Sequence, residues 1–397
     1  MKTTIKLSIW AVLLSVGSAF AQSSVVPKNF GKAKDYRNEI IIPNVGGYNV
    51  YKADLHTHTF HSDGDVSPAL RVEEAWHDGL DIVAITDHME YRRIERELYP
   101  LMKGYITPEL LEAGKAVNTN LCNSAPSSYG VLADFNVNYE KAAERGNELG
   151  IMVIKGVEIT RGKEGDYNAL FTTDNNKIYD PNLEQTIRNA RKQGAFIFHN
   201  HPFKFSSQYN KKQPAHCAYL YNAGLIDGME LANGFYVWNN LISYCLNNDY
   251  APIATSDIHN IATTLLPSAG KEYYRNMTLI LSKKCDAKSI KSALLAKRTI
   301  AYSGNLLIGN ELLLADLFKA CVQVETIGVG ADSKRVLITN KSSLPYSFRW
   351  ESGKEGFVAG LSATVVEVSK GCNLLGLEIT NMKYSKTKSP VVFFKLK

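Results

Sequence analysis

Three histidines and two aspartates stand within the stretch Asp54–Gly64, DLHTHTFHSDG, in a chain that has only nine histidines. His56 and His58 follow an apolar, strand-like approach. In an extended backbone, side chains two residues apart point to the same face. Imidazole and carboxylate groups on one face are the usual ligands of Zn, Mn and Fe ions. The stretch therefore predicts a metal site, although a single His-x-His is weak evidence by itself.

The other histidines and acids that could bind metal also follow predicted strands. They are Asp87-His88 after Asp81–Thr86, Glu158 in Ile151–Ile159, His199 and His201 after the strand that begins at Ala195, and Asp257 and His259 after Ile253–Ser256. Parallel α/β barrels build their sites at the C-terminal ends of their strands. The candidates are too many for one tetrahedral ion, so we expect several. Paired cations are the usual arrangement for phosphoryl hydrolysis.

No other catalytic motif competes with this interpretation. The sequence contains no GxxxxGK[ST] loop, no GxGxxG after a strand and no GxSxG nucleophile turn. Nucleotide binding through a glycine-rich phosphate loop and serine-dependent acyl transfer therefore lack sequence support.

Repeated strand and helix patterns place these residues. The predicted strands are Val50–Leu55, Asp81–Thr86, Ile151–Ile159, Ala195–His199, Asp227–Leu231, Ile253–Ser256 and Met277–Leu281. Amphipathic helical stretches lie between them, beginning with Ala69–Trp76 behind the cap Ser67-Pro68. Alternating strands and helices indicate parallel pairing with helices outside. Repetition over residues 50–306 favours a closed α/β barrel over an open sheet.

The pattern changes after residue 307. A helix-like stretch, Leu312–Lys319, is followed by short alternating segments with turn residues between them: Val336–Thr339, Tyr346–Trp350, Ala363–Val368, Leu374–Ile379 and Val391–Phe394. We expect residues 307–397 to form a small all-β domain of the sandwich type. This part contains no histidine, so we expect no chemistry there.

The N-terminus has the pattern of a secretory signal peptide. Lys2 and Lys6 precede the apolar run Leu7–Val16, and Ala19-Phe20-Ala21 offers small residues for cleavage before Gln22. We therefore expect residues 1–21 to be removed, residues 22–49 to form an extension, and the protein to be periplasmic or secreted. Cleavage removes two lysines and no acids, which lowers the net charge from +6 to +4. That mild excess argues against a nucleic-acid surface, and no membrane contact is expected after cleavage.

The motifs, taken in order, resemble those of the PHP (polymerase and histidinol phosphatase) family. They are Asp54-Leu55-His56-Thr57-His58…Ser62-Asp63-Gly64, Ile85-Thr86-Asp87-His88, Gly156-Val157-Glu158-Ile159, Asn200-His201-Pro202 and Thr255-Ser256-Asp257-Ile258-His259. The resemblance spans about residues 50–303. It implies a distorted seven-stranded β/α barrel with a trinuclear metal centre that hydrolyses phosphate esters.

The resemblance also implies a ligand set. One ion would take His56, His58, Glu158 and Asp257; a second would share Glu158 and use His201; a third would take Asp63, His88 and His259. The family usually supplies a further histidine to the second ion, and the position that matches it here is Asp166. Aspartate can ligate the same ion and favours harder metals. Asn168 is a weaker alternative ligand.

Four other residues are candidates for substrate contact or proton transfer. Arg161 and Arg275 could grip the phosphate in a bidentate way, and a salt bridge is the equal alternative for each. His61 could donate a proton to the leaving group, or lie on an exposed loop. His199 could line the pocket. We expect Asp87 to orient His88 or another ligand.

The sequence thus predicts an exported hydrolase of small-molecule phosphate esters that uses two to three Mn, Zn or Fe ions and metal-bound hydroxide. Because the protein is expected outside the cytoplasm, histidinol phosphate does not fit as substrate. The barrel with an all-β tail also resembles PHP proteins that act on phosphodiesters, which favours diesters over monoesters. Two alternatives remain: a non-catalytic metal-binding or ligand-binding protein with an altered second site, or an amidohydrolase-like enzyme. A bridging glutamate instead of a lysine disfavours the latter.

Overall fold

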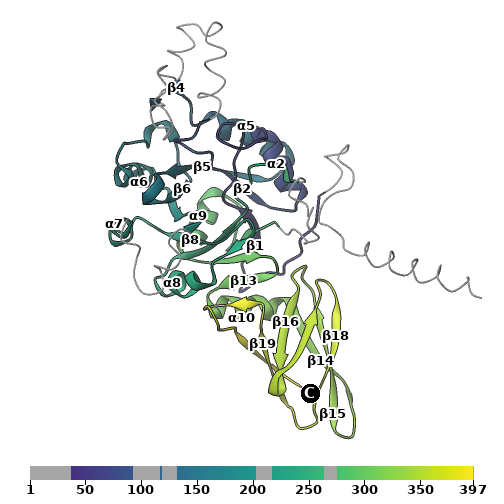
Figure 1. Ribbon diagram of the computed structural model, residues 1–397. Coiled ribbons are helices and arrows are strands. Elements are labelled where there is room, and N and C mark those ends of the chain that lie inside the picture. Colours follow the sequence, from purple (N-terminus) through teal and green to yellow (C-terminus); the bar gives the residue numbers. More distant parts are fainter. Residues whose placement is uncertain (1–36, 93–116, 119–131, 203–216, 263–274, 397) are drawn as a thin grey trace, which may run out of the picture.

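The computed structural model describes residues 37–92, 117–118, 132–202, 217–262 and 275–396 (Figure 1). An α/β body carries a smaller all-β part that extends from one end (Figure 1). The predicted signal peptide and most of the predicted extension lie outside the described residues. Within the described ranges, no helix is both long enough and apolar enough to cross a bilayer.

The body is built on one 12-stranded sheet, ordered β10-β8-β7-β6-β5-β2-β1-β11-β12-β13-β20 with β9 attached to β8. Its strands are β1 (Asn49–Asp54), β2 (Ile82–Ile85), β5 (Met152–Thr160), β6 (Asp166–Leu170), β7 (Phe196–His199), β8 (Gly228–Asn233), β9 (Tyr236–Val237), β10 (Ala251–Thr255), β11 (Met277–Ser282), β12 (Thr299–Ser303), β13 (Leu306–Gly309) and β20 (Met382–Lys383). A separate pair outside this sheet consists of β3 (Val117–Asn118) and β4 (Leu132–Ala133).

The sheet curls until the residues that follow β10 meet those that follow β1, while β10 itself lies beside β11, where the Thr278 hydroxyl bonds the backbone of Ala254. An isolated parallel bridge joins Thr57 to Ile258, just beyond the ends of β1 and β10. The amide of Asp257 donates to the carbonyl of His56 at 3.0 Å, and the amide of His58 donates to the carbonyl of Ile258 at 3.1 Å. The α/β barrel expected from the sequence is thus a distorted one, with a seam at this bridge.

Several strands depart from the predicted repeat. β12 and β13, which were not predicted, continue the sheet from β11 in antiparallel pairs. β6, which the sequence patterns did not predict as a strand, runs antiparallel to both β5 and β7. β11 corresponds to the predicted strand Met277–Leu281, but it pairs with β1 antiparallel. The pairs β1–β2, β2–β5, β7–β8 and β8–β10 are parallel, as predicted for the core of the barrel.

Helices cover the outside of the curled sheet. They are α2 (Pro68–His77), α5 (Val137–Leu149), α6 (Leu183–Lys192), α7 (Ala218–Asn222) and α8 (Ile242–Asn247). The buried face of α9 (Ala287–Leu295) instead joins the interior cluster of the barrel. Polar caps begin several of them: the side chains of Ser67, Asn182 and Asp286 accept backbone amides at the starts of α2, α6 and α9. Residues such as Leu55, Phe196 and Phe198 fill the interior of the barrel, whereas Ile187 and Leu220 pack against its outer wall.

The C-terminal part begins with α10 (Glu311–Cys321) and contains two antiparallel sheets. One sheet consists of β14 (Val322–Val329), β15 (Ser333–Asn340) and β18 (Ala363–Ser369), and the other of β17 (Lys354–Val358), β16 (Tyr346–Trp350), β19 (Leu374–Ile379) and β21 (Val391–Lys395). The predicted segments are all present, while β14 and β17 were not predicted. Buried residues of both sheets, such as Ile338 and Phe348, belong to a core that continues to Leu279 and Leu307 of the body.

Candidate metal centre

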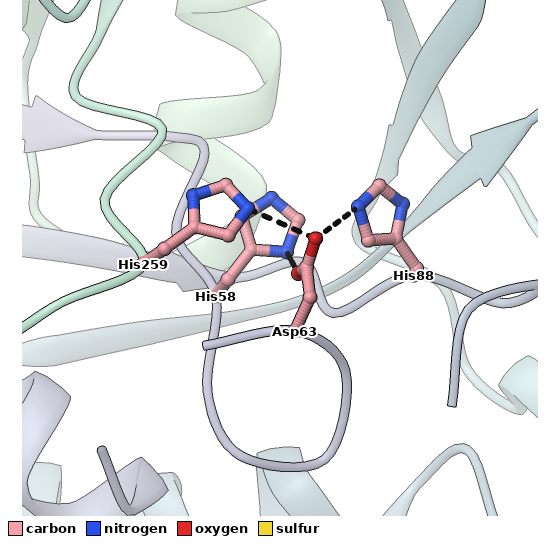
Figure 2. A group of neighbouring side chains, drawn as sticks. All are labelled: His58, Asp63, His88 and His259. Carbon is pink, nitrogen blue, oxygen red and sulfur yellow. Dashed lines mark ion pairs between the residues drawn. The ribbon is translucent and has the colours of Figure 1, made fainter. Parts of the chain in front are cut away.

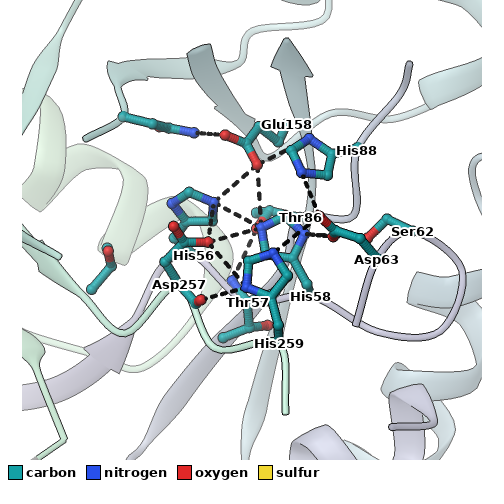
Figure 3. Close-up of polar contacts among 12 residues, drawn as sticks. His56, Thr57, His58, Ser62, Asp63, Thr86, His88, Glu158, Asp257 and His259 are labelled. Carbon is teal, nitrogen blue, oxygen red and sulfur yellow. Dashed lines mark hydrogen bonds and ion pairs between the residues drawn. The ribbon is translucent and has the colours of Figure 1, made fainter. Parts of the chain in front are cut away.

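The metal-ligand candidates converge at the C-terminal ends of the barrel strands (Figure 3). Their ligand atoms form three groups, and within each group the atoms lie within 4.8 Å of one another. The groups are His58, Asp63, His88 and His259; His56, Glu158 and His201; and His56, His58 and Asp257. His56 and His58 are each shared by two groups, so the three groups form one continuous centre.

Asp63 is the common partner of the first group (Figure 2). Its Oδ2 lies 3.4 Å from His88 Nε2 and 3.2 Å from His259 Nε2, and its Oδ1 lies 3.4 Å from His58 Nδ1. The rings of His58 and His259 stack with centroids 4.2 Å apart. The structure therefore adds His58 to the set that the family resemblance implies for the third ion.

Glu158 lies at the middle of the centre and is fully buried. Its Oε2 lies 3.1 Å from His56 Nε2, 3.2 Å from His58 Nε2 and 3.2 Å from His88 Nδ1. Its Oε1 lies 3.3 Å from His201 Nε2 and accepts the Asn200 side-chain amide at 2.8 Å. A carboxylate with both oxygens directed at different imidazoles has the geometry of a bridging ligand.

Glu230 determines which nitrogen of His56 faces the centre. Its Oε1 lies 2.8 Å from His56 Nδ1 and accepts the hydroxyl of Thr255 at 2.6 Å. Its Oε2 accepts the backbone amide of His201 and the side-chain amide of Asn233. Because this carboxylate acts as an acceptor in every contact, we assign the His56 proton to Nδ1. The lone pair of Nε2 then points into the centre.

The donor atoms fit divalent cations. His56 Nε2 and His58 Nε2 lie 3.0 Å apart, a distance at which two lone pairs repel unless a positive charge is shared between them. Asp63 Oδ1 and Asp257 Oδ1 are buried and make no hydrogen bond, although imidazole nitrogens lie 3.0 to 3.4 Å from them. Mixed imidazole and carboxylate donors suit Zn, Mn or Fe.

The electrostatics of the centre favour positive charge. Burial alone would lower the pKa of His58, but the carboxylates of Asp257 and Glu158 beside its ring raise it to about 10. Partial removal from water would lower the pKa of half-buried His201, but Glu158 beside its ring raises it to about 9. Burial would raise the pKa of Glu158, yet the surrounding imidazoles hold it well below its ordinary value. Protons and cations compete for these sites, because a metal ligand must be deprotonated.

Two of the candidate ligands have unusual backbone conformations. His201 has φ +22° and Asp257 has φ +51°, in the left-handed region that side chains other than glycine rarely adopt. Residues in such conformations cluster at functional sites, where the surrounding structure holds them.

The loop from Thr59 to Gly64 is held by Asp87. The Asp87 carboxylate accepts the Thr59 amide at 2.7 Å, the Ser62 hydroxyl at 2.7 Å and the Asn138 side-chain amide at 2.6 Å. Asp87 thus orients the loop that carries Asp63. Of the two expected roles, this is the orientation of another ligand and not of His88. The return of this loop requires Gly64, where an added Cβ would lie 2.8 Å from the His58 backbone.

The structure does not support the two arginines as phosphate ligands. Arg275 lies between Asp54 and Asp78, with ion pairs of 2.9 and 2.8 Å. Arg161 pairs with Glu90 and donates to the Asp180 carbonyl at 3.0 Å. Both guanidinium groups are committed to buried or partly buried ion pairs, which was the alternative for each.

His199 and His61 are also outside the centre. Along β7, Phe196 and Phe198 point into the barrel, so Ile197 and His199 point outward. His199 Nδ1 lies 2.7 Å from the Tyr221 hydroxyl, against the outer helices, and does not line the metal centre. The ring of His61 stacks on Phe60 with centroids 4.8 Å apart and belongs to none of the three ligand groups.

Asp166 lies beside the centre and outside the three ligand groups. Its Oδ2 is 3.6 Å from Nδ1 of His201, whereas Nε2 of that ring faces Glu158. At this distance the carboxylate acts on the His201 ring through its charge, since 3.6 Å is longer than a hydrogen bond. Asn168 is fully buried directly opposite Glu158 in the β5–β6 pairing, and neither atom of its amide makes a hydrogen bond.

Sequence patterns did not single out Glu230 or Asn233, and they placed Asn200 in a motif without giving its side chain a role. Asn233 donates to both Glu230 and Asp257, at 3.0 and 3.1 Å. One signal was available for Glu230, because it is a charged residue inside the otherwise apolar strand GMELAN. A carboxylate that is buried there requires polar partners, and these lie at the metal centre.

Comparison with known proteins gives one family. A sequence model of the PHP domain matches residues 54–229. A two-domain protein from Bacteroides vulgatus, described as containing a predicted PHP-like metal-dependent phosphoesterase, is 30% identical. Its crystal structure superposes with a TM-score of 0.76, and the alignment covers 91% of this chain and 99% of that one. A lesion-specific endonuclease from Pyrococcus furiosus is 17% identical, with a TM-score of 0.37 and coverage of 62% of this chain and 56% of that one. The curated proteins give no match.

Proposed function

From the premise that this chain belongs to the PHP family of metal-dependent phosphoesterases, we propose that it hydrolyses phosphodiesters in preference to phosphomonoesters, with two to three divalent cations. The observation that carries the proposal is the continuous centre formed by three ligand groups that share His56 and His58. Bound divalent cations supply a nucleophile from water at neutral pH and neutralise charge on the phosphate.

The residues of the chain hold and orient the reacting groups. Glu158 connects the imidazoles of His56, His58, His88 and His201. Glu230 fixes the ring of His56, and Asp87 fixes the loop of Asp63. The ion pairs of Arg161 and Arg275 argue against either guanidinium as a ligand of the phosphate.

The preference for diesters rests on the two-domain organisation. The barrel with an all-β C-terminal part resembles PHP proteins that act on phosphodiesters, and the Bacteroides vulgatus relative has two domains over the same length. Export is proposed from the basic, apolar and small-residue pattern of residues 1–21. Cell fractionation with N-terminal sequencing tests it: a mature protein that begins at Gln22 outside the cytoplasm is the expected result.

Parallel hydrolysis assays test the proposed reaction. Protein that begins at Gln22 is loaded with Mn, Zn or Fe and assayed on bis(p-nitrophenyl) phosphate and p-nitrophenyl phosphate. We expect turnover of both and faster turnover of the diester. His56→Ala should lower it at least about 10³-fold, because cations contribute several kcal/mol and each 1.36 kcal/mol is a factor of ten. His77→Ala is the matched control, since His77 ends α2 and contacts Trp76.

The ratio of the two rates decides between diester and monoester. No turnover of either ester by protein with demonstrated bound metal would contradict phosphate-ester hydrolysis. Equal activity of His56→Ala and the wild type would show that the turnover arises elsewhere.

A further inference from the structure

A buried arginine behind the metal centre bonds the backbone of two candidate ligands. Arg71 lies on α2 and is fully buried. Its Nε donates to the carbonyl of His58 at 2.9 Å, and its Nη2 donates to the carbonyl of His259 at 2.9 Å. Its Nη1 donates to the carbonyl of Asn260 at 3.1 Å. One guanidinium thus joins the loop after β1 to the loop after β10.

Glu74, one helical turn further along α2, completes this connection. Its Oε2 pairs with Arg71 Nη1 at 2.5 Å, and its Oε1 accepts the amide of Ala262 at 2.9 Å. The helix that carries both residues begins at a firm cap, since Ser67 accepts the Leu70 amide and Pro68 occupies the first turn. The pair therefore fixes both loops to a rigid element.

Stability gives no sufficient reason for this pair. A buried ion pair contributes little net stability, because the cost of removing two charges from water offsets their attraction. Apolar side chains of similar volume would avoid the cost of burying two charges, but they would leave three backbone carbonyls and the Ala262 amide without these partners. The specific result of the pair is geometric, because its donors define the distance between the backbones of His58 and His259.

Those two residues belong to the same ligand group. His58, Asp63, His88 and His259 form one group, and Arg71 bonds the backbone of two of its members. The group of His56, Glu158 and His201 receives no hydrogen bond from Arg71 or Glu74 among the contacts of the described residues.

We propose that Arg71, together with Glu74, is a positioning residue for the cation held by His58, Asp63, His88 and His259. The inference rests on the proposed multinuclear centre and goes further by assigning one of its ions to a support of its own. Neither side chain touches the cation. Both act through the backbone of its ligands.

Mn²⁺ binding tests the proposal without reference to activity. Arg71→Met keeps the length of the side chain and removes its donors. Isothermal titration with Mn²⁺ and metal analysis after desalting should show one step weakened 10- to 100-fold, the usual range for loss of a partner that orients a ligand. The step that belongs to His56, Glu158 and His201, a group that contains neither His58 nor His259, should stay within about twofold of the wild type. Arg71→Lys should recover part of the loss, since an ammonium group can still donate to these carbonyls.

Arg191→Met is the matched control. Arg191 also bonds a carboxylate, that of Asp227 at 2.7 Å, and a carbonyl, that of Gly224 at 2.8 Å. It lies next to the start of β8, at the opposite end of the barrel from the metal centre, so Mn²⁺ binding should match the wild type. If Arg71→Met does not fold, Glu74→Gln decides, because it should show the same selective loss to a smaller degree.

Three results would contradict the proposal. Arg71→Met could bind every Mn²⁺ with wild-type affinity, it could lose all steps in parallel, or Glu74→Gln could leave a destabilised protein with intact binding. A wild-type protein that binds a single equivalent would instead contradict the multinuclear centre itself. The two failures are therefore distinguishable.

Discussion

The metal-binding end of the barrel and the C-terminal sandwich bury different kinds of side chain. At the barrel end, Asp54, Glu158 and Glu230 are fully buried, each with polar partners. The sandwich buries aliphatic and aromatic residues such as Ile338 and Phe348 at alternate positions of its strands. Burial of apolar side chains stabilises a fold and requires no specific polar partner, whereas buried carboxylates cost free energy unless they are paired. We therefore expect the sandwich to determine stability and the barrel end to determine metal binding.

Phe348→Ala should produce the largest change in stability. Phe348 is 1% exposed on β16, and truncation of a buried phenylalanine costs about 3–5 kcal/mol. Chemical denaturation should show this loss, while the folded fraction binds Mn²⁺ as the wild type does. A loss of metal from the folded variant would contradict this division of roles, since it would show that the sandwich affects metal binding at the centre.

Chelation should have the next largest effect, and it should act on the barrel. A ligand that binds only the folded state stabilises it by about 2.7 kcal/mol at one hundred times its dissociation constant. Removal of metal with EDTA should lower the free energy of unfolding by an amount of this order. An unchanged melting temperature for protein shown to contain metal before chelation would contradict a role of the cations in stability.

The chelated protein should also acquire a dependence on pH. The pKa of His58, about 10, and that of His201, about 9, are raised in the folded state above the ordinary value of 6.5. Their contribution is fully present below pH 6.5 and is lost as the pH rises through 9 and 10. Melting of the chelated protein at a series of pH values checks this, with the metal-loaded protein expected to lack the same decline.

Glu230→Gln tests whether a buried carboxylate at the barrel end acts on metal affinity. Loss of the charge behind His56 should weaken Mn²⁺ binding 10- to 100-fold, which is about 1.4–2.7 kcal/mol. Glu351→Gln is the control in the sandwich, where Glu351 accepts the Ser369 amide at 2.8 Å. Equal Mn²⁺ affinities for the two variants would contradict the expectation that carboxylates at the barrel end, and not those of the sandwich, determine metal affinity.

Asp166→His should have the smallest effect. The carboxylate of Asp166 lies 3.6 Å from His201 Nδ1, which is longer than a hydrogen bond. Activity should fall by less than about tenfold, because the variant loses a negative charge beside the His201 ring. A large gain in activity would instead show that the natural aspartate marks a decayed site, and steady-state kinetics separate the two outcomes.

Sequence patterns located most of the centre because its ligands follow strands. The order of strand ends placed His56, His88, Glu158 and Asp257 at one end of a barrel, and the structure brings them together there. The patterns could not decide the roles of Arg275 and Arg161. Arg275 pairs with Asp54 across 221 residues of sequence, and such a contact leaves no local signal.

The sequence patterns also failed to predict which face of β7 carries His199 and that β6 is a strand. β7 reads FIFH and is buried on both faces, so period-2 alternation gave no indication that His199 points outward. β6 reads DYNAL, and two of its residues are polar because they face the metal centre. That polarity concealed the strand. The residues that broke the usual pattern were those beside the functional site.

The seam of the barrel gives the bound ions a second role. The bridge between Thr57 and Ile258, with the peptide hydrogen bonds at it, joins the segments that follow β1 and β10. His56 and His58 stand on one side of this seam, and Asp257 and His259 stand on the other. An ion coordinated from both sides is therefore also a cross-link between the first and last parallel strands of the barrel. Binding of such an ion would therefore join the two sides of the seam in addition to organising the ligands.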